Sequence, residues 1–224
     1  MKLLQDIDKA KHIVIKAEND FLASASALYT YILRLHKKVS LVCISENIDD
    51  KLSFLPWFDK IKSIGSLSAD LNISLDITSL QLYELFKRNA IKPNQKMATA
   101  LYAGVLKETD GFLNHSVNGT QFAVAKELIE FGADNKICTD SILKSTTLSL
   151  LRLKATMLKN MILADDAQVA IMKISDDELR ATGATQEDCN EILQEAMKLP
   201  YVNEIVLVKS DEQNKVLKKI KKEF

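Results

Sequence analysis

Residues 12–44 carry the signals of a strand, a helix and a second strand in direct succession. Residues 12–17 are short, apolar and β-branched, which predicts a strand, and residues 39–44 repeat that pattern. Between them, residues 21–36 place apolar side chains at helical spacing. Two strands joined through a helix pair in parallel, with a right-handed crossover. The sequence therefore predicts an α/β fold built on a parallel sheet with helices on both faces.

Weaker signals extend this pattern along the chain. The remaining elements expected in the first half are a helix over 3–10, strands near 61–64 and 72–77, and helices over 79–87, 93–108 and 120–131. Those expected in the second half are strands at 169–174 and 204–208, helices after the capping box 175–178 and over 185–198, and a basic helical tail over 214–224. An apolar-periodic segment between the halves predicts one long connector helix, so we divide the chain into residues 1–140, 141–163 and 164–224.

Charge and cysteine content narrow the class of protein. The 30 basic side chains equal the 30 acidic ones, which argues against a broadly basic nucleic-acid binder but leaves room for a local basic groove. Cys43, Cys138 and Cys189 are far apart and show no metal-binding spacing, so we expect buried free thiols in a reducing compartment. Neither a membrane-spanning run nor a signal-peptide pattern is present, which favours a cytoplasmic protein without a membrane partner.

Three segments resemble a known enzyme family. Residues 16–28 begin with Lys-Ala-Glu-Asn-Asp at the end of the first predicted strand and continue as a helix rich in small residues. Residues 98–112 read Ala-Thr-Ala-Leu-Tyr-Ala-Gly-Val-Leu-Lys-Glu-Thr-Asp-Gly-Phe. Residues 128–134 include Phe-Gly-Ala-Asp. In this order they resemble the DHH phosphoesterase superfamily, in its nanoRNase/pAp phosphatase branch. Residues 168–188 resemble the start of the associated DHHA1 substrate domain. The resemblance implies a DHH-like domain followed by a truncated α+β DHHA1-like domain.

The catalytic motifs of that family are altered in this sequence. Family members hold two Mn²⁺ or Mg²⁺ ions on Asp and His ligands. In the first motif, which reads His-x-Asn-Pro-Asp-x-Asp-Ala, Lys16 replaces the histidine, Asp20 keeps the first aspartate and Leu22 replaces the second. The Asp-His-His motif has no counterpart, because residues 45–76 contain acidic side chains but no histidine. Glu108 replaces the last metal-binding aspartate, and the Gly-Gly-Gly-His phosphate loop is missing.

The residues that remain at these positions are the candidate site. The resemblance makes Asp20 and Glu108 the candidate catalytic residues and the only candidate metal ligands, with Lys16, Thr109 and His115 lining the site. Each has a structural alternative: Asp20 as a helix N-cap, Glu108 as an exposed helix end and His115 as a solvated loop residue. The ammonium of Lys16 either pairs with both carboxylates where a metal would sit or lies on the surface.

These changes leave three hypotheses for function. The first is a degenerate phosphoesterase-like scaffold, inactive or weakly active and expected to need no cofactor, that binds a nucleotide, a short RNA or a protein partner. The second is a working Mn- or Mg-dependent phosphoesterase of the oligoribonuclease/pAp phosphatase type, with ligands drawn from residues 45–76. The third is a structural subunit that forms a homo-oligomer or joins another protein. Losing several catalytic groups together favours the first.

Overall fold

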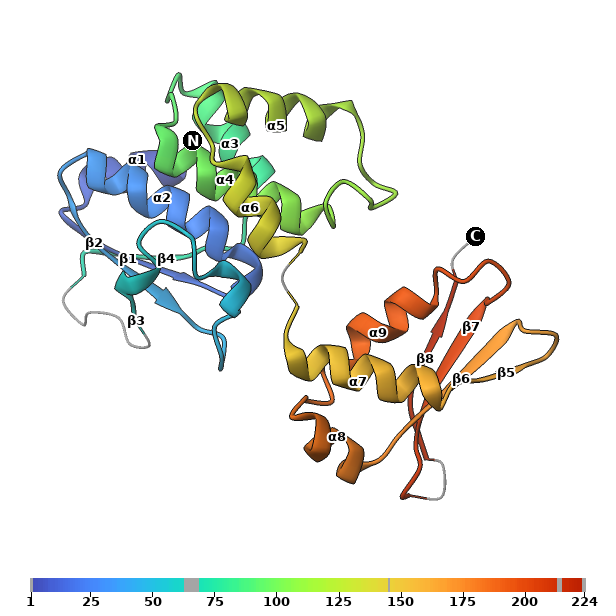
Figure 1. The fold of residues 1–224 in the computed structure, drawn as a ribbon. Helices are drawn as coiled ribbons and strands as arrows, with labels where there is room; N and C mark the ends of the chain where they lie inside the picture. The colour runs from blue at the N-terminus through green and yellow to red at the C-terminus, as the bar shows by residue number, and fades with distance from the viewer. Residues whose placement is uncertain (1, 63–68, 145, 213–214, 223–224) are drawn as a thin grey trace. The chain divides into compact units, whose positions relative to one another are not determined.

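The chain forms two compact units, Met1–Ser145 and Thr146–Phe224, which we call unit 1 and unit 2 (Figure 1). The computed structural model describes residues 2–62, 69–144, 146–212 and 215–222. Unit 1 contains a four-stranded parallel sheet in the order β3-β2-β1-β4. Its strands are β1 (His12–Ala17), β2 (Lys38–Cys43), β3 (Ile61–Lys62) and β4 (Leu71–Ser74). The predicted α/β fold with a parallel sheet is confirmed.

Strand β1 lies inside this sheet and is buried on both faces. Ile13, Val14 and Ile15 are fully buried although their side chains alternate between the two faces, as expected of a parallel strand covered on both sides. Ile15 pairs with Leu41 of β2 on one side and with Ile73 of β4 on the other. The loops after β1 and β4 both leave the carboxyl end of the sheet, where Ser24 Oγ in the first turn of α2 donates to Ile77 O at 2.9 Å. Parallel sheets commonly place their functional groups at such a point.

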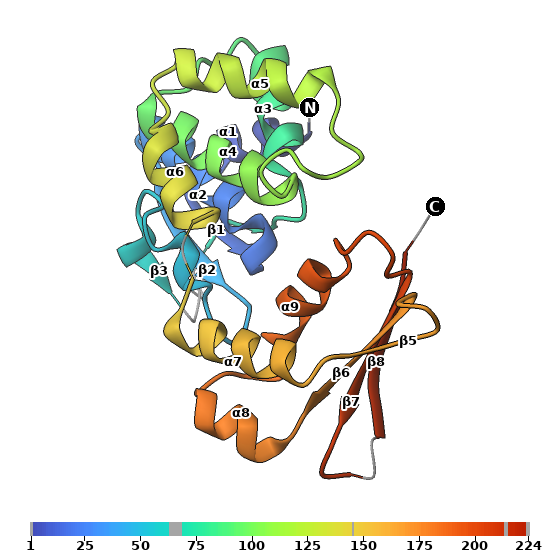
Figure 2. The same cartoon turned by 45° about the vertical axis from the view of Figure 1, so that its right-hand side comes forward.

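The helices of unit 1 pack around a shared apolar core. They are α1 (Lys2–Lys9), α2 (Leu22–Arg34), α3 (Ser79–Arg88), α4 (Gln95–Glu108), α5 (Gly119–Glu130) and α6 (Asn135–Ile142). Helix α2 packs on β1 and β2, and α4 packs on α2, α3, α5 and α6. Figures 1 and 2 show α4 between α2 on one side and α3 and α5 on the other. Helix α4 is therefore central, and its last turn reaches the carboxyl end of the sheet.

Gly104 permits the close contact between α4 and its neighbours. A Cβ atom at this position would lie 1.7 Å from Ser79 Oγ, 2.6 Å from Ser79 Cβ and 3.1 Å from Ala23 Cβ. Any larger side chain would have to push α4 away from the first turn of α3 and from α2. The missing side chain thus sets the spacing of three helices, two of which begin next to the candidate site.

Unit 2 has a separate core and a mixed sheet. Its elements are α7 (Leu148–Lys159), β5 (Ile162–Ala164), β6 (Val169–Ile174), α8 (Asp176–Thr182), α9 (Cys189–Ala196), β7 (Glu204–Lys209) and β8 (Lys215–Lys221). The strand order is β5-β6-β7-β8, with β6 and β7 parallel and both outer strands antiparallel. Helices α7 and α9 pack on this sheet through buried side chains that include Leu153, Met157 and Ile192. The predicted capping box at Ser175 is present.

The predicted connector over residues 141–163 is not one helix. Helix α6 ends at Ile142 and α7 begins at Leu148, with Thr147 as its N-cap. The Thr147 side chain accepts a hydrogen bond from Leu150 N at 3.1 Å, which starts a new helix. Apolar periodicity continues on both sides of this break, so the pattern alone did not reveal it.

The prediction of a helical C-terminal tail is also wrong, because Lys215–Lys221 is strand β8. Leu217 and Ile220, three residues apart, both pack against the core of unit 2, a spacing that favours a helix. In a regular strand, two residues three apart face opposite sides. The ladder with β7 has a register shift between Leu207 and Val208, a β-bulge that turns both side chains to the same face.

Two simpler predictions can be compared directly with the structure. Cys43, Cys138 and Cys189 are free and buried, as expected. Across the four described ranges, every helix is too short or too polar to cross a membrane. The location of the protein in the cell stays a prediction.

Candidate functional site

Asn19 ties together the loops that follow β1 and β2. It begins the short 3₁₀ helix Asn19–Phe21, directly after β1. Its side-chain Nδ2 donates to Asn47 O at 2.7 Å, and its Oδ1 accepts from Asp49 N at 3.2 Å. Its backbone N donates to Ser45 Oγ at 3.0 Å. One side chain and its amide therefore fix residues 45–49 against the end of β1.

Lys107 places an ammonium group over these loops. From the last turn of α4, its Nζ lies 3.4 Å from Asp20 Oδ1 and 3.5 Å from Asp49 Oδ2, and it donates to Asn19 O at 3.2 Å. The lysine side chain is 27% exposed, so its charge is partly withdrawn from water. Two carboxylates and a carbonyl surround one cation here, so the ammonium offsets one of the two negative charges. We call Asn19, Asp20, Asp49 and Lys107 the lysine cluster.

Glu108, the next residue, points to a different partner. Its Oε1 accepts a hydrogen bond from Ser79 N at 2.6 Å, at the first turn of α3. A carboxylate at a helix N-terminus satisfies a free amide and the positive end of the helix dipole. Burial nevertheless raises the pKa of Glu108, because desolvation outweighs these hydrogen bonds. Glu108 is therefore neither exposed nor paired with Asp20; it is half-buried and accepts from the first amide of α3, whose N-cap is Thr78.

Replacing Glu108 by glutamine should change how stability depends on pH. The pKa of Glu108 is higher in the folded protein than in the unfolded chain, so the folded protein holds this proton more tightly. The resulting stabilisation is complete below the pKa of the unfolded chain and is lost as pH rises through the pKa of the folded protein. Glutamine cannot ionise, yet its oxygen still accepts from Ser79 N. We expect the stability of Glu108→Gln relative to wild type to increase between pH 4 and pH 7, measured by urea unfolding.

A control for this experiment is Glu108→Ala, which removes the acceptor of Ser79 N altogether. It should be less stable than Glu108→Gln across the whole pH range, because the first turn of α3 loses its partner. A stability difference between Glu108→Gln and wild type that stays flat from pH 4 to pH 7 would contradict the raised pKa.

The predicted cluster of Lys16, Asp20 and Glu108 does not form. Lys16 is exposed at the end of β1, and its ammonium has no hydrogen-bond or ion-pair partner within the ranges that the structure describes. Asp20 pairs with Lys107, and Glu108 accepts from Ser79 N at the start of α3. The alternative of Asp20 as an N-cap is also wrong, since Phe21 occupies that position of α2 and no side chain caps it. The cation comes from α4 rather than from β1.

The other two predicted site residues take different places. Thr109 is buried at the end of α4, where its Oγ1 donates to Val105 O at 2.6 Å and accepts from Phe112 N at 3.1 Å. It shapes the turn after α4 and offers no free group. His115 is exposed in the loop between α4 and α5. Their roles in a reaction stay a prediction.

The donors at this end of the sheet do not fit a pair of divalent cations. Two such ions need several carboxylate or imidazole ligands that converge within a few ångströms. Within the described part of the chain, no three His, Cys, Asp or Glu side chains are grouped so that they could hold a metal ion. Asp20 and Asp49 already face an ammonium, which repels a metal cation. We therefore assign no metal ligand among the candidate residues.

Comparison with known proteins finds a solved structure with the same fold, but no family model matches the sequence. The structure superposes on an exopolyphosphatase-related protein from Bacteroides fragilis with a TM-score of 0.77 and 16% identity, over 96% of this chain and 80% of that one. A Methanococcus jannaschii protein described as a putative family II inorganic pyrophosphatase aligns over 88% and 82% of the two chains at 15% identity, with a TM-score of 0.35. No curated protein matches the sequence either. The first similarity establishes a shared fold.

Proposed function

We propose that this protein is a DHH phosphoesterase-like scaffold that binds a nucleotide or short RNA and does not hydrolyse it efficiently. The ordered motifs in residues 16–28 and 98–134 support the relationship, as does the fold shared with an exopolyphosphatase-related protein. That neighbour's description points to phosphate-bearing ligands. The nanoRNase/pAp phosphatase branch is the part of the proposal that rests on sequence motifs alone.

The lysine cluster is the observation that carries the inactive part of this proposal. Metal-assisted phosphoryl chemistry needs cations that polarise the phosphate and activate water. Here Lys107 supplies one fixed positive charge to Asp20 and Asp49. An ammonium can attract a phosphate but cannot lower the pKa of a coordinated water, because its nitrogen has no vacant coordination site. Binding without turnover is the expected result.

Two features of unit 1 suit a nucleotide. Lys16 presents an exposed ammonium at the carboxyl end of β1, where a phosphate could pair with it. Four residues after Glu108, the ring of Phe112 stacks on Phe122 with centroids 4.9 Å apart and 20° between the planes. Phe122 is 56% exposed and offers a flat apolar surface of the kind on which bases stack.

A hydrolysis assay tests the proposal directly. Purified protein is incubated with Mn²⁺ and either 3′-phosphoadenosine 5′-phosphate or a dinucleotide, and release of phosphate or mononucleotide is followed. We expect no release above the protein-free blank. Turnover that Asp20→Ala abolishes, and that the exposed control Asp59→Ala leaves intact, would overturn the inactive scaffold and favour a working metal-dependent enzyme.

Calorimetric titration tests the binding part. We expect Mn²⁺ to give no binding heat and the nucleotide to bind, with weaker binding in Lys16→Ala. The matched control is Lys38→Ala, an exposed lysine at the amino end of β2, which should bind as wild type does. If neither Mn²⁺ nor nucleotide binds, the nucleotide proposal fails and a structural subunit with a protein partner becomes the better hypothesis.

A further inference from the structure

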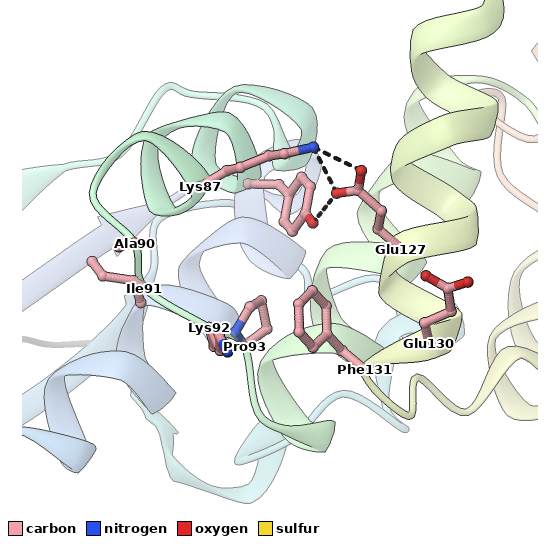
Figure 3. Close-up of a pocket in the computed structure, with 9 residues that line it drawn as sticks. Lys87, Ala90, Ile91, Lys92, Pro93, Glu127, Glu130 and Phe131 are labelled. Atoms are coloured by element: carbon pink, nitrogen blue, oxygen red, sulfur yellow. Dashed lines mark hydrogen bonds and ion pairs between the residues drawn. The ribbon is translucent and has the colours of Figure 1, made fainter.

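A pocket lies at the end of unit 1 away from the lysine cluster. It has a volume of about 400 Å³ and is lined by the last turns of α3 and α5 and by the segment that follows α3 (Figure 3). Helix α3 begins beside Glu108 and runs about 15 Å along its ten residues, so its last turn lies far from the lysine cluster. The volume is in the range of roughly 300–1,000 Å³ that is typical of sites for small organic molecules.

Rings and branched side chains form the wall of this pocket. Ile91, Pro93 and Phe131 line it together with the ring of Tyr83, and Pro93 and Tyr83 are themselves buried. Proline and aromatic rings offer flat apolar faces on which a planar group can lie. The wall therefore suits an aromatic ring better than a sugar or a phosphate.

The segment after α3 is fixed before any ligand arrives. Ile91 N donates to Phe86 O at 2.9 Å, and Ala90 N donates to Lys87 O at 3.1 Å. The guanidinium of Arg34 donates to Lys92 O at 2.9 Å, which anchors the backbone of that lysine. A pre-formed wall reduces the entropy lost on binding.

Both carboxylates at the rim already have partners. Glu127 contacts Lys87 Nζ at 2.7 and 2.8 Å and accepts the hydroxyl hydrogen of Tyr83. The ammonium of Lys87 keeps the pKa of Glu127 low, so this group stays ionised and neutralises Lys87. Glu130 pairs with Lys126 at 3.0 Å.

The four charged lining residues sum to zero, but their pairings among the described residues leave one cation without a partner. Lys92 is exposed, and within the described ranges its ammonium has no hydrogen-bond or ion-pair partner. Figure 3 shows it beside Pro93 and apart from the joined pair of Lys87 and Glu127. One available cation next to an apolar wall is complementary to an anion that carries an apolar ring.

We propose that this pocket binds a small aromatic carboxylate, with its ring against Ile91, Pro93 and Phe131 and its carboxylate paired with Lys92. The ring of such a ligand covers the apolar wall, and its carboxylate neutralises the unpaired ammonium of Lys92. Neutral aromatic molecules would satisfy only the wall, and inorganic anions only the lysine. The proposal is independent of what binds at the carboxyl end of the sheet.

Indole-3-acetate and its neutral counterpart indole-3-acetamide are suitable probes, titrated into the full chain by calorimetry. We expect the acid to bind at least about tenfold more tightly than the amide, because the amide forms no charged pair with Lys92. Lys92→Met should abolish this preference, and Lys92→Arg should keep it. The control Lys136→Met removes an exposed lysine outside the pocket and should change nothing.

The location of the probe is checked by amide chemical shifts in residues 89–92 and 127–131. Equal affinity for acid and amide, an unchanged preference in Lys92→Met, shift changes elsewhere, or no binding at millimolar probe would each overturn the proposal. Lys92 is a surface residue, so its variants are expected to fold, and the comparison does not depend on a core substitution.

Discussion

Gly104→Ala is expected to lower the free energy of unfolding of unit 1 by about 3 kcal/mol or more. The new methyl group would meet Ser79 Oγ at 1.7 Å and Ser79 Cβ at 2.6 Å, so α4 and the first turn of α3 would have to separate. The backbone N–H of Ser79 also donates to Glu108 Oε1, so the same separation of the helices would strain this hydrogen bond. Urea unfolding followed by tryptophan fluorescence measures the effect, because the single tryptophan, Trp57, lies in unit 1.

A matched glycine separates the steric clash from the general effect of adding a methyl group. Gly119 starts α5, and a Cβ atom added to it would have no neighbour within 4 Å, so Gly119→Ala should change stability by less than about 0.5 kcal/mol. Adding Ser79→Gly to Gly104→Ala should recover part of the loss, since it removes the side chain that clashes. Equal stability of the two alanine variants would refute this account of helix spacing.

Asn19→Ala is expected to cost about 2 kcal/mol, because its side chain loses two hydrogen bonds to the backbone of residues 47–49 and a weaker one from Cys43 Sγ at 3.7 Å. Asn47 O and Asp49 N would lose their partner, and residues 45–49 would no longer be tied to the end of β1. Asp49 would then be free to leave Lys107. Besides the loss of stability, hydrogen exchange in residues 45–49 should become faster, which mass spectrometry detects.

Asn47→Ala is the control for this substitution. It changes an asparagine in the same loop that offers Asn19 only its backbone carbonyl, so both stability and hydrogen exchange should stay close to wild type. If Asn19→Ala and Asn47→Ala behave alike, the side chain of Asn19 does not organise this end of the sheet.

The elements that could be predicted are those with a strong local pattern. Residues 12–17 and 169–174 coincide with β1 and β6, because short β-branched runs with clear turn signals leave few alternatives. The prediction of a helical tail was wrong because a β-bulge in the pairing with β7 places Leu217 and Ile220 on the same face. That bulge depends on a strand elsewhere in the sequence. The break between α6 and α7 was hidden by apolar periodicity on both sides.

The candidate site was predictable in position but not in its contacts. Asp20 does lie at the carboxyl end of the sheet, and Glu108 lies in the last turn of α4. They were expected to share Lys16, but Asp20 pairs with Lys107 and Glu108 with Ser79 N. Lys107 was missed because a lysine in the last turn of a helix is common in any protein. Its bond to Asn19 O joins residues 88 positions apart, which no local pattern reports.

The position of Lys107 also determines what this end of the sheet responds to. A positive charge carried on a side chain is not removed by a chelator and is not lost on dilution, so the acidic loops keep their counter-charge whatever the supply of free divalent ions. Such contacts weaken as dissolved salt screens them. The contacts of Lys107 with Asp20 and Asp49 are therefore expected to loosen as ionic strength rises, while the hydrogen bonds of Asn19 persist.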